Sequence, residues 1–221
     1  MMIQCEIGKI VLASASPYRK QLLEQVFPAF ETSHPGVDEK SINDQDPTRL
    51  AQKRAFAKGF EVASREKSAV TIGADQVLSC GNAVFSKATC DFEAKRCLAD
   101  LQGRTHYLHS AFCLFASDND DSVHPFHAGV VSVAMNMRKL SGQEIDQYIR
   151  TGEWKGSVGC YKIEEWGLHL FEQPLGDYYA IVGLPLIEIL AGLRGAGLDG
   201  LLAPRGPWRL AFKPRGLSAG R

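Results

Sequence analysis

The chain has 221 residues, of which 45% are hydrophobic, so it is long enough for one domain with a substantial core. Its formal net charge is zero, but residues 204–221 carry five basic and no acidic side chains, which leaves −5 on the rest. Such an acidic body argues against general nucleic-acid binding. We expect no membrane span or secretory signal, and the six cysteines, which form no CxxC pair, indicate reduced thiols in a cytoplasmic protein.

Strands and helices are predicted to alternate in the first part of the chain. Residues 9–13 (KIVLA) have the pattern of a short buried strand. Ser16 and Pro17 favour a helix start, because serine caps a first turn and proline has the backbone angle of a first helical residue. Residues 30–43 are of mixed polarity and predict strand ends and loop. A second helix is predicted over residues 47–65.

This second helix has one apolar and one basic face. The side chains available to the core are Leu50, Ala51, Ala55, Ala57 and Phe60. The opposite face carries Arg49, Lys53, Arg54 and Lys58. Because such faces are usually solvated, we expect these four basic side chains to be exposed.

The middle of the chain is predicted to be mostly strand. Residues 69–73 form a buried strand, and residues 76–86 form a hairpin around a Cys-Gly-Asn turn. Thr89 is expected to cap a helix over 89–101, which a glycine closes. Residues 105–116 are apolar and aromatic, and residues 131–137 alternate, which is typical of a half-buried strand.

The C-terminal part begins with a capping box, SGQE, that predicts a helix over 141–152. Residues 168–172 and 178–182 bracket Pro-Leu-Gly-Asp and predict an antiparallel hairpin. Residues 185–194 are predicted to form the last helix, opened by a proline.

The interleaving of helices, strands and hairpins indicates an α/β fold with a mixed twisted sheet and flanking helices. We place the domain at residues 1–198. Residues 199–221 are basic and rich in glycine and proline, and we expect a flexible tail.

Two acidic positions are candidate metal ligands. Glu39 ends the loop sequence VDE, and Asp75 follows the predicted buried strand at 69–73. Carboxylate oxygens suit Mg²⁺ or Mn²⁺, and ligands of open α/β sheets bind at the carboxyl ends of strands. A solvated acidic loop and a turn-forming aspartate would have the same sequences, so both readings stay open.

Three positions in the first strand-to-helix connection, and one lysine further on, could bind phosphate. Ser14, Ser16 and Arg19 lie at a predicted helix N-terminus, where amides and the helix dipole favour anions. Lys87 returns toward Asp75 if the predicted hairpin forms. An ordinary helix cap and an ordinary surface lysine remain the alternatives.

The segment 157–165 (SVGCYKIEE) is a further candidate. Gly159 permits close backbone approach, and Tyr161 could stack or form a hydrogen bond. Lys162 and Glu164 share a face if the segment is extended. A charged strand face would look the same. The chain has no P-loop, no GxGxxG, no GxSxG, and no HExxH among its histidines.

Taken in order, these segments resemble the Maf family of nucleoside triphosphate pyrophosphatases. The resemblance rests on LASASPYRKQLL, VDE, GADQV, the lysine at 87, SGQEIDQYIRTGE, the GxY segment and DYYAIVGLPL, and covers roughly residues 9–195. It implies a fold related to the inosine triphosphatases, often dimeric. It assigns Asp75 as catalytic aspartate, Glu39 as motif glutamate and Lys87 as motif lysine. It assigns phosphate binding to Ser14, Ser16 and Arg19.

The chain departs from the family pattern at several positions. Tyr18 replaces the first of two arginines, so Arg19 alone must serve. Arg54 stands where many members have lysine, which keeps the charge but changes its geometry. Three further substrate-binding candidates look more like the branch acting on 7-methyl-GTP than like the dTTP/UTP branch: Gln76, Lys162 and Glu164. The segment SVGCYKIEE also resembles members with no assigned substrate.

These residues predict a hydrolase that converts a nucleoside triphosphate, or a modified one, to the monophosphate and pyrophosphate. Mg²⁺ or Mn²⁺ is expected between Glu39 and Asp75, with Asp75 acting on water and the cationic groups neutralising phosphate charge. The alternatives are a 7-methyl-GTP-specific enzyme and a nucleotide-binding regulator of septum formation without significant turnover. We expect a nucleotide as partner, no nucleic acid and no membrane, and a possible homodimer.

Overall fold

The computed structural model describes residues 3–119, 122–172, 176–198 and 208–212. Its strands are β1 (Ile3–Ile7), β2 (Lys9–Ala13), β3 (Glu31–Ser33), β4 (Ala69–Cys80), β5 (Ala83–Phe85), β6 (Thr105–Ser117), β7 (Val123–Asn136) and β8 (Trp208–Phe212). Its α-helices are α1 (Pro17–Glu24), α2 (Pro47–Ala63), α3 (Asp91–Leu101), α4 (Gly142–Thr151), α5 (Tyr178–Val182) and α6 (Leu186–Gly195). Two 3₁₀ turns are η1 (Glu39–Ser41) and η2 (Trp166–Leu170).

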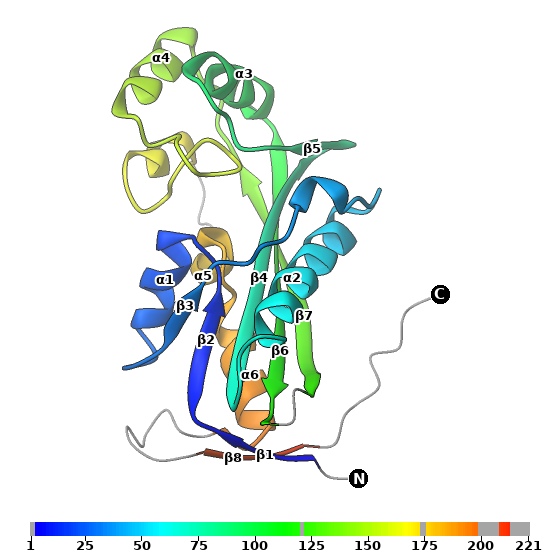
Figure 1. Cartoon of the computed structure of the whole chain (residues 1–221). Coiled ribbons are helices and arrows are strands. Elements are labelled where there is room, and N and C mark those ends of the chain that lie inside the picture. The colour runs from blue at the N-terminus through cyan, green and yellow to red at the C-terminus, as the bar shows by residue number, and fades with distance from the viewer. Residues whose placement is uncertain (1–2, 120–121, 173–175, 199–207, 213–221) are drawn as a thin grey trace.

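The main sheet has six strands and confirms the predicted mixed α/β fold. Its order is β3-β2-β4-β6-β7, with β5 paired to β4 beyond the end of β2. The β2 pairs with β3 and β4 are parallel, whereas β4 pairs antiparallel with β5 and β6, and β6 with β7. Strands β1 and β8 form a separate antiparallel pair at the lower end of the molecule (Figure 1). Thus part of the segment predicted as a tail pairs with the N-terminal strand, and the rest of 199–221 lies outside the described residues.

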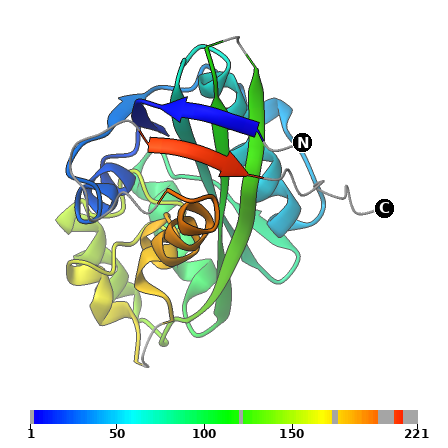
Figure 2. The same ribbon diagram turned by 90° about the horizontal axis from the view of Figure 1, so that it is seen from below.

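Helices cover both faces of this sheet, as Figure 2 shows from below. The alternation of side chains decides which face each helix covers. On β4 and β6, Ile72, Ala74 and Leu114 pack in one cluster with residues of α1 and α6. Residues of the other parity, such as Val77 and Ala111, pack with Leu50, Ala51 and Ala55 of α2.

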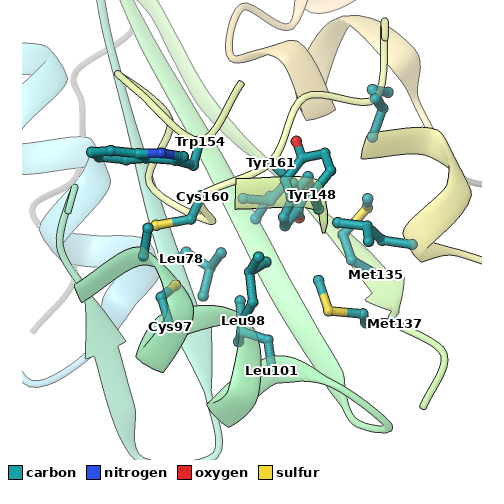
Figure 3. Close-up of a cluster of buried hydrophobic side chains, with 14 of the residues drawn as sticks. Leu78, Cys97, Leu98, Leu101, Met135, Met137, Tyr148, Trp154, Cys160 and Tyr161 are labelled. Carbon is teal, nitrogen blue, oxygen red and sulfur yellow. The ribbon is translucent and has the colours of Figure 1, made fainter. Parts of the chain in front are cut away.

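The upper end of the sheet carries a second core, formed with α3, α4 and the segment after α4. Figure 3 shows Cys160 and Tyr161 of that segment among Leu78, Leu98 and Met135, which come from β4, α3 and β7. The segment at 156–164 is therefore attached to the sheet by buried side chains. The predicted capping box at the start of α4 is present, and Gly152 ends the helix in the left-handed conformation.

The structure overturns two local predictions. Residues 168–172 and 178–182 do not form a hairpin: the first overlaps η2, and the second is the helix α5. Asp177 caps α5 through Ala180 N, and Gly183 ends it at φ 113°, so helix-capping residues were mistaken for turn residues. Cys90, not Thr89, is the N-cap of α3.

No helix in the described part of the chain combines the length and the apolar character needed to cross a membrane.

Candidate active site

A cavity of about 510 Å³ lies between the start of α1, the helix α2 and the segment at 156–164. Its walls come from the start of α1, η1, α2, the β4–β5 hairpin, the segment at 156–164 and α5. Nine of the ten predicted site residues line it, namely Ser16, Arg19, Glu39, Arg54, Asp75, Gln76, Lys87, Lys162 and Glu164. Ser14 is buried behind the wall. The polypeptide therefore brings together groups that are far apart in sequence.

Asp75 lies in the middle of β4, not at a strand end as predicted, because β4 continues to pair with β5 and β6. The neighbouring strand β2 does stop here, since its last residue, Ala13, pairs with Gly73. Asp75 therefore lies just past the carboxyl end of β2, and it is only 4% exposed. The prediction that Asp75 ends its own strand is therefore wrong: the strand that ends beside it is the parallel neighbour β2.

A lysine that we expected to be solvated joins the two acidic residues. Lys58 of α2 is buried, and its Nζ lies 2.6 Å from Asp75 Oδ1 and 2.7 Å from Glu39 Oε1. The predicted inward position Phe60 is instead 46% exposed. One signal in the sequence could have revealed this position. Lys58 lies three residues after Ala55, so the two side chains share one side of the helix. In the structure this side faces β4.

Glu39 and Asp75, here called the acidic pair, have carboxylate oxygens that could bind a ligand. Asp75 Oδ2 is buried and has no hydrogen-bond partner among the described residues. Partial burial raises the pKa of Glu39, but the hydrogen bond and charge of Lys58, with the charges of Arg54 and Lys87, outweigh it and lower the pKa overall. Glu39 is therefore held in its ionised form.

These oxygens fit a divalent cation that is only partly held by protein. Within the described residues, no group of three or more His, Cys, Asp or Glu side chains could enclose a metal ion. Mg²⁺ commonly takes one or two carboxylates and completes its shell with phosphate oxygens and water. The donor set of Glu39 and Asp75 matches that pattern, because Asp75 Oδ2 is not used by another hydrogen bond of the described residues.

Arg19 is fixed at the cavity wall by the framework. Its Nε donates to Gly183 O at 2.9 Å, and its Nη1 donates to Ala74 O at 3.0 Å. Ser14 Oγ accepts from Nη1 at 3.5 Å and from the amide of Ser16 at 3.1 Å. Ser14 therefore orients the arginine rather than lining the cavity.

The helix N-terminus has fewer free amides than expected. Pro17 has no N–H, and the Arg19 amide donates to Ser16 Oγ, the predicted N-cap. Anion binding at α1 then depends more on the Arg19 side chain than on backbone amides.

Lys87 reaches the cavity through the predicted hairpin. Phe85 of β5 pairs with Leu78 of β4, so the chain two residues later is level with Gln76. Desolvation and the charge of Arg19 lower the pKa of the Lys87 ammonium, although the nearby acidic groups oppose this. Lys87 is therefore close enough to interact electrostatically with Glu39 and Asp75.

Gln76 and Arg54 each form hydrogen bonds to neighbouring segments of the protein. Gln76 Nε2 donates to Ser110 Oγ and to the carbonyls of Ala180 and Ile181 in α5 at 2.9–3.0 Å. Arg54 Nη2 lies 3.4 Å from Ile42 O. Each side chain lines the cavity while holding a neighbouring segment.

The segment at 156–164 contributes a second group of charges to the cavity lining. The Lys162 ammonium lies 5.0 Å from the centre of the Tyr18 ring, the residue that replaces an expected arginine. Glu164 of the same segment is exposed. Tyr161 turns inward instead: it is buried, and its hydroxyl lies 2.7 Å from His106 Nε2. A methyl group at Gly159 would collide with the Tyr161 ring, so the glycine makes room for this inward-turned side chain.

The fold and the site define an α/β protein with a mixed sheet and a cleft lined by both acidic and basic side chains. The chain belongs to the Maf family: the family model described as Maf-like protein matches residues 9–196.

Several curated relatives cover nearly the whole of this domain. A 7-methyl-GTP pyrophosphatase from Brucella abortus is 40% identical over 84% of this chain and 95% of that protein. A dTTP/UTP pyrophosphatase from Pyrococcus furiosus is 35% identical over 82% of this chain and 92% of that protein. A nucleoside triphosphate pyrophosphatase from Anaplasma phagocytophilum is 38% identical over 86% and 96%. Likeness to the solved Staphylococcus aureus Ham1 protein is weak, with a TM-score of 0.35 and 19% identity over 63% of this chain and 79% of that one.

Proposed function

We propose that this protein is a nucleoside triphosphate pyrophosphatase, a hydrolase that releases pyrophosphate from a nucleoside triphosphate. The observation that carries the proposal is the buried Asp75, which lines a cavity together with Arg19, Arg54 and Lys87 and whose Oδ2 has no hydrogen-bond partner among the described residues. Three relatives whose names describe pyrophosphatases of different nucleotides support the same reaction.

The reaction is a displacement at the α-phosphorus. Asp75 orients a water molecule and accepts its proton as the water oxygen bonds to phosphorus and the bridging bond to the β-phosphate breaks. Arg19 and Lys87 offset the charge that grows on the pyrophosphate as it leaves. Glu39 and Asp75 would hold a Mg²⁺ or Mn²⁺ ion, which supplies further charge neutralisation when bound.

The base is proposed to be a purine. Glu164 in the cavity lining can accept hydrogen bonds from the N1–H and N2–H₂ groups of guanine, or face a cationic methylated purine. Relatives named for 7-methyl-GTP and for dTTP/UTP are 40% and 35% identical to this chain, so overall identity alone does not select the base. We therefore rank 7-methyl-GTP and GTP ahead of the pyrimidine nucleotides.

A panel of natural and modified nucleoside triphosphates, assayed with Mg²⁺ and with Mn²⁺, tests the reaction. Pyrophosphate is the expected first product, and Asp75→Asn should lower its rate of release by about a hundredfold or more, because the group acting on water is lost. Orthophosphate as first product would mean attack at the γ-position. Stoichiometric nucleotide binding without turnover would instead favour the regulator.

A further inference from the structure

Lys58 differs from the other basic residues of α2 because it is buried against the acidic pair. Its side chain is 8% exposed and contacts one oxygen of Asp75 and one of Glu39. Lys53 of the same helix is 55% exposed and pairs with Asp44 outside the cavity. A buried ammonium is unfavourable unless it is paired, so the two carboxylates and Lys58 stabilise one another as a unit.

Arg54 does not take this place, although it precedes Lys58 by one turn of the same helix. Its Nη2 bonds to a backbone carbonyl, and its Nε is buried without a partner among the described residues. Within α2, Lys58 is therefore the cation that contacts both carboxylates.

The Lys58 ammonium itself bridges the two carboxylates of Glu39 and Asp75. Lys58 holds Asp75 Oδ1 and Glu39 Oε1, which leaves Asp75 Oδ2 as the orphaned buried oxygen. One of the two negative charges is offset by Lys58 itself. The other cations that line the cavity near the pair are Arg19, Arg54 and Lys87.

The charge around the pair is thus positive before any ligand binds. A free divalent cation is disfavoured in such a field, because each nearby positive charge raises its energy. A metal–triphosphate complex keeps a net negative charge and is attracted by the same groups.

We infer that Lys58 is a positioning residue: it holds one oxygen of each carboxylate and keeps the pair from binding a free divalent cation tightly. A divalent cation would then bind together with the triphosphate, and Asp75 would offer Oδ2, which has no hydrogen-bond partner among the described residues. Naming the ligand a triphosphate rests on the proposed function.

The inference is tested by Mn²⁺ binding to the nucleotide-free protein, with unbound Mn²⁺ followed by its electron paramagnetic resonance signal. Lys58→Met removes the charge at nearly constant volume, and Lys58→Gln also keeps hydrogen-bond donors, so at least one variant is expected to fold. Both should bind Mn²⁺ about tenfold or more tightly than the wild type, because a competing positive charge is gone. Lys53→Met, on the same helix, is the matched control and should bind Mn²⁺ like the wild type.

Thermal unfolding gives a second readout that does not depend on turnover. Mn²⁺ should raise the unfolding temperature of Lys58→Met more than that of the wild type, since the metal replaces the lost ammonium. Equal Mn²⁺ affinity in the wild type and both Lys58 variants would overturn the inference. If no nucleotide yields pyrophosphate but the Lys58 variants still bind Mn²⁺ more tightly, the proposed function fails and the role of Lys58 stands.

Discussion

Two neighbouring residues of β4 serve opposite faces of the sheet. Asp75 points to α2, where Lys58 meets it, and Gln76 points to α5, where it bonds to the carbonyls of Ala180 and Ile181. This follows from the alternation of side chains along a strand. At the scale of single residues, β4 therefore directs Asp75 toward α2 and directs Gln76 toward α5 on the other face of the sheet.

Glu164 should set the preference among bases. Replacing it with glutamine removes a charged acceptor from the cavity lining, so the ratio of kcat/KM for purine over pyrimidine triphosphates should fall by about tenfold. The best turnover should change less. Glu165→Gln is the control, since Glu165 is also exposed but does not line this cavity. An unaltered ranking of substrates in Glu164→Gln would show that the carboxylate does not contact the base.

At the scale of elements, α2 and β4 approach each other through two glycines. A methyl group at Gly73 would lie 2.6 Å from the Cα of Gly59 in α2 and would also collide with the carbonyl of Ala55. This backbone contact is two residues from Asp75 and one from Lys58. The close packing is thus what allows a lysine of α2 to reach an aspartate in the sheet.

Gly73→Ala should force α2 away from β4, because the colliding atoms belong to the backbone and cannot rotate aside. We expect a loss of about 2 kcal/mol or more in the free energy of unfolding, with reduced pyrophosphate release. Urea unfolding measures the first effect. Gly142→Ala is the control: no atom lies within 4 Å of the added methyl group, so stability should be unchanged or slightly higher. Equal stability of both variants would contradict the close contact.

At the scale of the whole molecule, the cavity depends on the second core, which attaches the segment at 156–164 to the sheet. His106 of β6 is fully buried there and contacts the Tyr161 hydroxyl. Burial lowers the pKa of His106 from 6.5 to about 4. The folded protein therefore binds fewer protons than the unfolded chain between these values, and its stability should fall as the pH drops through that range.

His106 alone should account for a loss of about 2 kcal/mol between about pH 7.5 and pH 5. His106→Leu removes the titrating group, so this variant should lose correspondingly less stability on acidification in urea unfolding. Tyr161→Phe deletes the hydrogen bond but keeps the imidazole buried, and should retain the wild-type pH dependence. If His106→Leu lost as much stability on acidification as the wild type does, a group other than His106 would be responsible for the loss.

What the sequence determined by itself was local structure and which side chains are candidates for the site. The caps at Ser16 and Ser141 were predictable, because a cap depends on residues three or four positions away. The hairpin that returns Lys87 was also predictable from its turn. The family resemblance supplied Glu39 and Asp75, which the structure places within reach of one lysine.

Only the tertiary structure decided which charged side chains are buried and what they contact. Lys58 looked solvated in the helix pattern, and α5 looked like a strand, because both assignments depend on partners distant in the sequence. The pairing of β1 with β8 joins the two ends of the chain for the same reason. A buried charge is tolerated only where opposite charges converge on it, and that convergence exists only once the chain is folded.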